Sequence, residues 1–271
     1  MLLINKKVKP AAGDLELMAR QLRLTLIAEQ CEAMLTVAQE AKMTGRELLT
    51  FMFSKELERR KQNRSLMGIQ SAHFPFVRTL EEFDFSVIPG LDPGRIRDLQ
   101  QLEWVRTGAN LLLQGPPGVG KTHLAIGLGR EAINQDFKVL FTTAEDLIYE
   151  LIAAGHEGHL RERLAAYAKP AVLIIDELGY LPLGADAAHV LFALINARYE
   201  KKSTVITCNR SISEWGMMLG DSTTVMALLD RFLHHSEVLT ISGDSYRLLE
   251  KKRQGLLVTA NPAKTEELLR P

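Results

Sequence analysis

The sequence lacks the features of a secreted or membrane-spanning protein. Two cysteines in 271 residues, Cys31 and Cys208, are too few for a disulfide framework. No apolar run approaches the ~20 residues that cross a bilayer. The start of the chain places Lys6 and Lys7 after a very short apolar patch, which is the reverse of a signal peptide. We therefore expect a cytoplasmic protein that makes no contact with membranes.

The chain also has no net charge, because its 33 lysines and arginines balance its 33 aspartates and glutamates. A global cationic field is thereby excluded, and any binding of DNA must rely on local basic patches. The sequence contains neither an aromatic ladder that stacks bases nor a recognition-helix motif, so base-specific readout of DNA is not expected. The hydrophobic fraction of 46% is enough for one sizeable domain and a smaller one.

A phosphate-binding pattern, G-x-x-x-x-G-K-S/T, follows the apolar run 110–114. Its residues are Gly115, Pro116, Pro117, Gly118, Val119, Gly120, Lys121 and Thr122. Glycines let successive backbone N–H groups turn toward phosphate oxygens, and the helix expected over residues 123–134 presents the positive end of its dipole to the same anion. We expect Lys121 on the β- and γ-phosphates of ATP and the Thr122 hydroxyl on Mg²⁺. The strand–loop–helix setting disfavours the alternative of a glycine-rich turn without a ligand.

A second apolar run, residues 171–175, ends in the carboxylates Asp176 and Glu177. At the carboxyl end of a strand, Asp176 would hold Mg²⁺ through water, and Glu177 would orient and polarise an attacking water. The alternative is a buried strand with a solvated acidic end. The phosphate loop makes the catalytic interpretation the preferred one.

Three further side chains are candidates for contacts with the γ-phosphate. Asn209 ends the apolar run 204–208 and would hydrogen-bond the γ-phosphate or the lytic water. Arg231 would act as a finger in trans on the nucleotide of the next subunit, and Arg247 would contact phosphates in its own subunit. Read singly, an asparagine here is more often a turn residue, and an arginine is more often a surface ion-pair partner.

The order of the elements predicts an α/β fold, with a parallel sheet flanked by helices and a small all-helical domain before it. Residues 14–70 contain no proline and have helical periodicity, with a capping box at Thr44 and Glu47. Beyond a boundary near residue 72, short apolar strands alternate with helices. The predicted strands are 110–114, 138–142, 171–176, 203–208 and 238–241. The predicted domains are 1–72, 73–250 and a tail over 251–271.

With these parts in order, the chain resembles an AAA+ ATPase, specifically the IstB-type transposition ATPases of bacterial insertion sequences, a family similar to the DnaC-type helicase loaders. The resemblance covers about residues 15–250. Besides the phosphate loop with His123 to Ala125, the segments that carry it are 79–85, 140–144, 175–182, 213–216, 229–235 and 245–248.

The resemblance implies roles for several of these residues. Asn209 would be the sensor, Arg231 the finger in trans and Arg247 the second sensor. His123 would belong to the nucleotide loop, and Phe83 and Phe85 would lie near the adenine, with ordinary core packing as the alternative. The chain departs from the family at Cys208, where serine is more frequent.

DNA contacts are expected in two places. AAA+ initiators and loaders are similar in carrying an extra helix before the carboxylate strand that touches DNA, and here Arg161 and Arg163 would meet phosphates from it. A basic run supplies a second candidate, with Arg59, Arg60, Lys61 and Arg64. The alternatives are a solvated amphipathic helix in the first place and a solvated charged face in the second, where Glu56 and Glu58 weaken the basic character.

The sequence therefore predicts an ATPase that uses ATP and Mg²⁺ to assemble into an oligomer on DNA and assists the transposase of the same element in target selection. Duplex DNA is favoured, with little sequence preference. The main alternative is a DnaC-type replicative helicase loader. A small-molecule phosphotransferase is disfavoured because the carboxylate pair and Asn209 favour water as the acceptor. A scaffold that binds ATP without hydrolysis is disfavoured because Glu177 is present.

Overall fold

The computed structural model describes residues 15–88, 90–179, 184–220, 222–243 and 245–246. The chain divides into two compact units, Met1–Met67 and Gly68–Pro271. Arg247 and the predicted tail over 251–271 lie outside the described residues, and the DNA and nucleotide candidates other than Arg247 lie within them. Within the part of the chain that is described, no helix combines the length and the apolar character needed to span a membrane.

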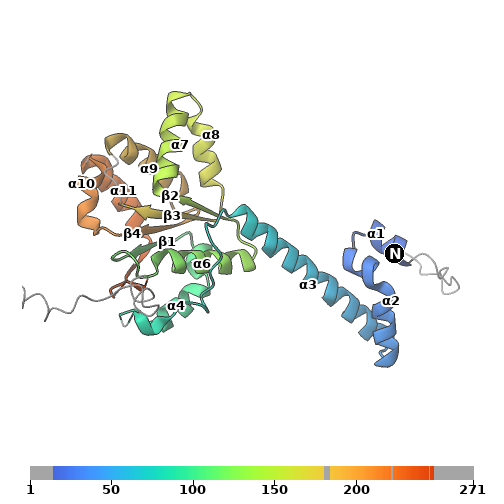
Figure 1. Ribbon diagram of the computed structural model, residues 1–271. Helices are drawn as coiled ribbons and strands as arrows, with labels where there is room; N and C mark the ends of the chain where they lie inside the picture. The colour runs from blue at the N-terminus through green and yellow to red at the C-terminus, as the bar shows by residue number, and fades with distance from the viewer. Residues whose placement is uncertain (1–14, 89, 180–183, 221, 244, 247–271) are drawn as a thin grey trace, which may run out of the picture. The chain divides into compact units, whose positions relative to one another are not determined.

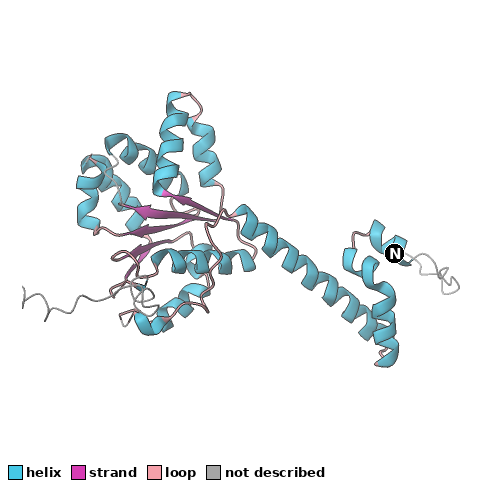
Figure 2. Cartoon of the chain, viewed as in Figure 1, coloured by secondary structure: helices cyan, strands magenta, loops and turns pink. Residues whose placement is uncertain are grey.

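The first unit is helical, as its periodicity predicts (Figure 2). Its helices are α1 (Leu15–Gln21), α2 (Thr25–Glu40) and α3 (Gly45–Ser71), of which the last residues belong to the second unit. The breaks fall where Arg23 and Lys42 adopt positive φ. The predicted capping box opens α3, since the Thr44 N–H donates to Glu47 Oε2 at 2.7 Å and the Glu47 N–H donates to Thr44 Oγ1 at 3.4 Å.

A carboxylate from α3 caps the start of α2. Leu24, the residue before the helix, provides no side-chain cap. Instead the buried Glu56 accepts the backbone N–H groups of Thr25 at 3.2 Å, Leu26 at 2.8 Å and Ile27 at 3.2 Å. Burial alone would raise the pKa of Glu56, but hydrogen bonds from these amides and from Arg60 outweigh it and lower the pKa. Glu56 is therefore a structural residue, because it satisfies N–H groups that a helix start leaves without partners.

The second unit is built on a five-stranded parallel sheet with the order β2-β3-β4-β1-β5 (Figure 1). The strands are β1 (Asn110–Gln114), β2 (Val139–Thr143), β3 (Val172–Leu178), β4 (Ser203–Cys208) and β5 (Ser236–Thr240). The predicted parallel α/β sheet is confirmed. Because β4 lies between β1 and β3, the carboxyl ends of these three strands are neighbours at one edge of the sheet.

Helices cover both faces of this sheet. Those of at least one full turn are α4 (Pro93–Gln100), α5 (Glu103–Arg106), α6 (Lys121–Asn134), α7 (Ala144–His156), α8 (Leu160–Ala168), α9 (Gly184–Arg198), α10 (Trp215–Leu219) and α11 (Ser222–His234). Strand side chains alternate between two cores: Leu111 and Leu113 pack with α4, α5 and α6, whereas Leu112 packs with α7, α9 and α11. Short helical turns are formed by η1 (Phe85–Val87) and η2 (Ile212–Glu214).

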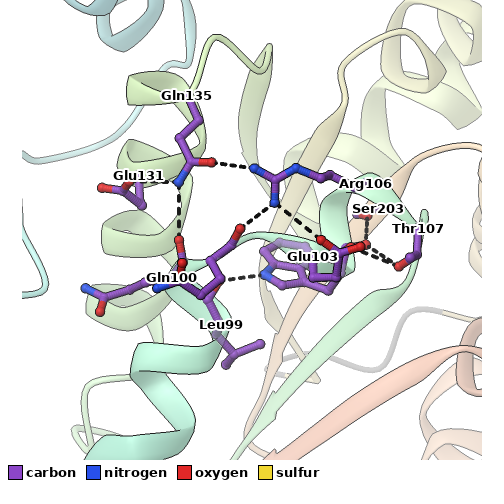
Figure 3. A network of polar contacts seen from close by, with 10 residues as sticks. Leu99, Gln100, Glu103, Arg106, Thr107, Glu131, Gln135 and Ser203 are labelled. Atoms are coloured by element: carbon purple, nitrogen blue, oxygen red, sulfur yellow. Dashed lines mark hydrogen bonds and ion pairs between the residues drawn. The ribbon is translucent and has the colours of Figure 1, made fainter.

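Polar contacts close the end of the sheet where the strands begin (Figure 3). Arg106 donates to Gln135 Oε1 at 2.8 Å, and Gln135 donates in turn to the Gln100 carbonyl at 3.3 Å. The Ser203 hydroxyl donates to the Trp104 carbonyl at 3.1 Å. These bonds join α5, the end of α6 and the start of β4. They fix the strands at this end of the sheet. The candidate site lies at the opposite end, where the strands have their carboxyl ends.

Candidate functional site

The phosphate loop joins β1 to α6, and two of its positions illustrate why glycine is required there. Gly120 has φ +88°, and a Cβ there would lie 2.6 Å from Phe83 Cε2. A Cβ on Gly115 would lie 2.1 Å from the Ile241 carbonyl oxygen. Any larger residue would displace the loop from the core or from Ile241, which directly follows β5. The loop therefore has a conformation that only this glycine pattern permits.

Backbone donors in the loop are concentrated in its second half. Pro116 and Pro117 have no N–H group, so residues 118–122 supply the donors that an anion would meet. Val119 is fully buried and packs in the core. The Lys121 ammonium group donates to the carbonyl oxygens of Gly115 and Pro116, both at 2.8 Å. The Lys121 ammonium group, the amides of residues 118–122 and the start of α6 thus lie in one short segment, an arrangement that suits phosphate.

Phe83 and His123 brace the loop from the core side. The Phe83 ring is buried and lies 4.9 Å from the Phe85 ring and 5.2 Å from the His123 ring, between centroids. His123 Nε2 lies 2.6 Å from the Thr79 carbonyl oxygen. These contacts are those of core packing, the alternative weighed above for Phe83. An adenine contact for Phe83 stays a prediction.

Thr122 and Asp176 form a pair that fits Mg²⁺. The Thr122 hydroxyl lies 3.0 Å from Asp176 Oδ1 and 3.1 Å from Oδ2. It can donate its proton to the carboxylate and still offer an oxygen lone pair to a metal. Asp176 is buried, and this burial raises its pKa although hydrogen bonds from Thr207 and Thr122 and the charge of Lys121 oppose the rise. The negative charge of the buried carboxylate is only partly stabilised by the groups around it. A hard divalent cation prefers oxygen ligands and would stabilise this charge.

A bulge in β3 places two carboxylates in succession at the strand end. Ile175 pairs with Ile206 and Leu178 with Cys208, so β3 has one residue more than β4 across the same interval. Within the bulge Glu177 has φ +63°, and its side chain is exposed next to the buried Asp176. A non-glycine residue in this conformation is strained, and such strain gathers at functional sites. The pair can therefore divide two tasks, a buried metal ligand and an exposed base.

Asn209 follows β4 with an unsatisfied oxygen. Its Oδ1 is buried and has no hydrogen-bond partner among the described residues. Gly179, with φ +103°, lies so close that a Cβ there would be 3.0 Å from this oxygen. A buried acceptor without a donor costs about 1–3 kcal/mol. A water molecule can donate the missing hydrogen bond, which is the role predicted for Asn209.

Of the two predicted arginines, the structure describes Arg231, which contacts α9 of its own chain. Arg231, on α11, donates to Asn196 Oδ1 of α9, and its guanidinium lies 4.9 Å from the centroid of the Phe192 ring. Arg247 lies outside the described residues. Tyr246, which precedes it, donates its backbone N–H to the Gly118 carbonyl at 3.0 Å. Action in trans by Arg231 and action in cis by Arg247 stay predictions.

The predicted DNA contacts lie on two helices, and several of them have acidic neighbours. On α8 Arg161 is exposed, whereas Arg163 lies 3.6 Å from Glu150 Oε2. On α3 Arg59 lies 3.6 Å from Glu29 Oε2, and Arg60 pairs with the buried Glu56 at 3.0 Å. Lys61 and Arg64 are exposed. Glu56 is therefore buried rather than solvated, and its ion pair with Arg60 offsets one positive charge of the basic run.

Sequence reasoning missed three residues that shape these features. Thr207 contacts the Asp176 carboxylate and the backbone N–H of Glu177, Gly179 approaches Asn209, and Glu56 caps α2. A signal for Thr207 existed, since it is a polar residue near the end of an apolar strand. For Gly179 the signal was a glycine soon after the carboxylates. Glu56 gave none, because a glutamate in a charged helix resembles its exposed neighbours.

Comparison with known proteins points in one direction. A family model described as IstB-like ATP binding protein matches residues 17–254. A protein of Pseudomonas aeruginosa named for ATP binding in the insertion sequence IS21 is 39% identical over 258 residues, covering 95% of this chain and 97% of its own. A protein of Geobacillus stearothermophilus so named in IS5376 is 43% identical over 235 residues, covering 86% of this chain and 93% of its own.

The fold has solved counterparts. The structure of AMPPCP-bound DnaA from Aquifex aeolicus superposes with a TM-score of 0.51 and 21% identity, covering 73% of this chain and 61% of that chain. At this identity the likeness concerns the fold alone, which is the AAA+ arrangement of a P-loop on a parallel sheet.

Proposed function

The chain belongs to the family of IstB-like ATP-binding proteins, and from this premise we propose that it hydrolyses ATP with Mg²⁺ in order to assemble on DNA and assist a transposase. The family membership predicted from the motifs is confirmed, and ATP binding comes with it. The observation that supports hydrolysis best is the contact of the Thr122 hydroxyl with Asp176 beside the phosphate loop. The phosphates of the nucleotide and the Mg²⁺ ion would both bind next to this contact.

Each residue of the site has a task in the proposed reaction. Lys121 and the amides of residues 118–122 would bind the β- and γ-phosphates, while Thr122 and, through water, Asp176 would hold Mg²⁺, which neutralises phosphate charge when bound. Glu177 would accept a proton from the attacking water, and Asn209 would fix that water with its unsatisfied oxygen.

The placement of Arg231 supports the proposed assembly. Arg231 is held by α9 of its own chain rather than by its own phosphate loop. We expect it to complete the site of a neighbouring copy, with Arg247 serving as the second sensor in cis. ATP bound at such an interface stabilises the oligomer by mass action, and hydrolysis releases it. DNA and ATP as partners fit a cytoplasmic location.

Hydrolysis is tested with Glu177→Gln. We expect kcat to fall by about 100-fold or more, while the affinity for a fluorescent ATP analogue stays within about twofold, because the amide keeps the shape but loses the base. Glu145→Gln, at an exposed glutamate in the first turn of α7, is the matched control. Hydrolysis by Glu177→Gln at the wild-type rate would show that Glu177 does not position the water.

DNA binding is tested by fluorescence anisotropy with duplex and single-stranded probes of mixed sequence, at physiological salt, with a slowly hydrolysed ATP analogue or with ADP. We expect analogue-dependent duplex binding, weakened by Arg161→Ala more than by Arg163→Ala because Arg163 already faces Glu150. A preference for single strands would favour a helicase loader. Absence of binding to either probe would remove DNA from the mechanism.

A further inference from the structure

Thr207 lies where β3 and β4 lose their common register. Its side chain is fully buried on β4. The adjacent pairs Ile175–Ile206 and Leu178–Cys208 leave Asp176 and Glu177 together opposite this one residue. In such a bulge the extra residue has no regular partner in the ladder, so its backbone polar groups must be satisfied in another way.

The Thr207 hydroxyl satisfies both bulge residues at once. It accepts the backbone N–H of Glu177 at 2.9 Å and donates its own proton to Asp176 Oδ1 at 2.5 Å. A hydroxyl has one proton to donate and lone pairs to accept, so these two bonds use its donor and one acceptor site. The same side chain thereby fixes the backbone at Glu177 and the carboxylate orientation at Asp176.

A threonine suits this task better than a longer polar residue. Branching at Cβ restricts χ1, so the hydroxyl is held in one direction within the strand. Another buried threonine on the strand shows the contrast: Thr204 accepts a bond from Arg198 Nε at 2.9 Å, at the end of β4 remote from the carboxylates. Both threonines are fully buried and lie on β4, but of the two only Thr207 contacts residues of the candidate site.

We propose that Thr207 is a positioning residue that sets the metal ligand Asp176 and the base Glu177 through a single hydroxyl. The inference rests on the proposed ATPase function and deepens it. With Thr207 in place, the carboxylate of Asp176 is oriented before Mg²⁺ arrives, and Glu177 retains its left-handed backbone. Without the hydroxyl, the Glu177 N–H loses its acceptor, and Asp176 keeps only the Thr122 hydroxyl to orient its carboxylate.

The test compares Thr207→Val, which removes the hydroxyl at similar volume, with Thr207→Ser, which restores it. For Thr207→Val we expect about a tenfold rise in the Mg²⁺ concentration at half-maximal hydrolysis and about a tenfold or greater fall in kcat. ATP-analogue affinity without Mg²⁺ should stay within about twofold, because the phosphate loop is untouched. Thr207→Ser should remain within about threefold of wild type, and Ile206→Val controls for strand packing.

Metal binding is also measured apart from turnover, by electron paramagnetic resonance of Mn²⁺ added to the ADP-bound protein. Thr207→Val should bind Mn²⁺ about tenfold more weakly than wild type. In an Asp176→Asn background the same change should add little to the loss of Mn²⁺ binding, since residues that act as a unit are not additive.

Two results would overturn the inference. One is wild-type Mn²⁺ binding and kcat in Thr207→Val. The other is an equal loss in Thr207→Ser that follows a lower melting temperature, which would indicate packing only. Measurements on the wild-type protein distinguish a failure of this inference from a failure of the proposed function. If the wild-type protein lacks Mg²⁺-dependent hydrolysis, the ATPase proposal fails. If it hydrolyses ATP and the Thr207 variants match it, only the role of Thr207 fails.

Discussion

Two buried carboxylates, one in each unit, illustrate different uses of a charge removed from water. Glu56 is 2% exposed and receives three backbone N–H groups as well as Arg60. Asp176 is 5% exposed and is met by two hydroxyls, with Lys121 as the charge that acts on it. The pKa of Glu56 is lowered and that of Asp176 is raised, with burial the largest influence on both.

The difference lies in how completely the protein itself supports the charge. Amide donors and a cation outweigh the desolvation of Glu56, so its negative charge stabilises the fold. At Asp176 neutral hydroxyls leave desolvation dominant, and a divalent cation would supply the missing support. A saturated buried carboxylate is therefore structural, whereas an unsaturated one beside a phosphate loop indicates a ligand site.

The strongest challenge to this comparison is Asp176→Asn. Because the folded protein does not fully support the charge, removing it should leave the melting temperature unchanged or raised, while Mg²⁺-dependent hydrolysis falls by about 100-fold or more. Calorimetry and a phosphate-release assay measure the two effects. A large loss of stability would place Asp176 in the same class as Glu56.

Glu56→Gln should give the opposite result. We expect the first unit to lose about 2–3 kcal/mol of unfolding free energy, because one amide oxygen cannot replace a charged carboxylate at three N–H groups. Hydrogen exchange at the Leu26 and Ile27 amides is the readout, and ATP-analogue affinity should not change. Glu58→Gln, at an exposed glutamate paired with Lys55, is the control and should alter exchange little.

The sequence predicts those parts of the fold and of the site that depend on residues close together in the chain, and misses those that depend on distant residues. The bounds of β1 and β4 are predicted to the residue because turn residues flank short apolar runs, and the loop and carboxylates follow from spacing alone. The bulge depends on pairing between β3 and β4, whose partners lie about 30 residues apart, so the contacts of Thr207 are invisible to periodicity. The cap on α2 is invisible for the same reason.

The smallest expected effect is a pH dependence that sharpens the comparison. The pKa of Glu56 is lowered from 4.5 in the folded state. Its contribution to the free energy of unfolding is therefore complete at pH values above its pKa in the unfolded chain. That contribution is lost as the pH falls through its pKa in the folded protein. The difference in stability between wild type and Glu56→Gln should therefore narrow below about pH 4.5. Denaturant melts of the full chain at successive acidic pH values measure it, and a constant difference would contradict the assignment.

The remote cap on α2 also orders events during synthesis of the chain. The carboxylate that accepts the Leu26 amide lies 30 residues downstream, so the first turn of α2 emerges from the ribosome without its acceptor. At about 5–20 residues per second, Glu56 follows after roughly 2–6 seconds. Until then α2 has a frayed start, and its completion coincides with the growth of α3. The start of α2 is therefore completed only when α3 has been made, and the nascent chain reaches the phosphate loop after that contact can form.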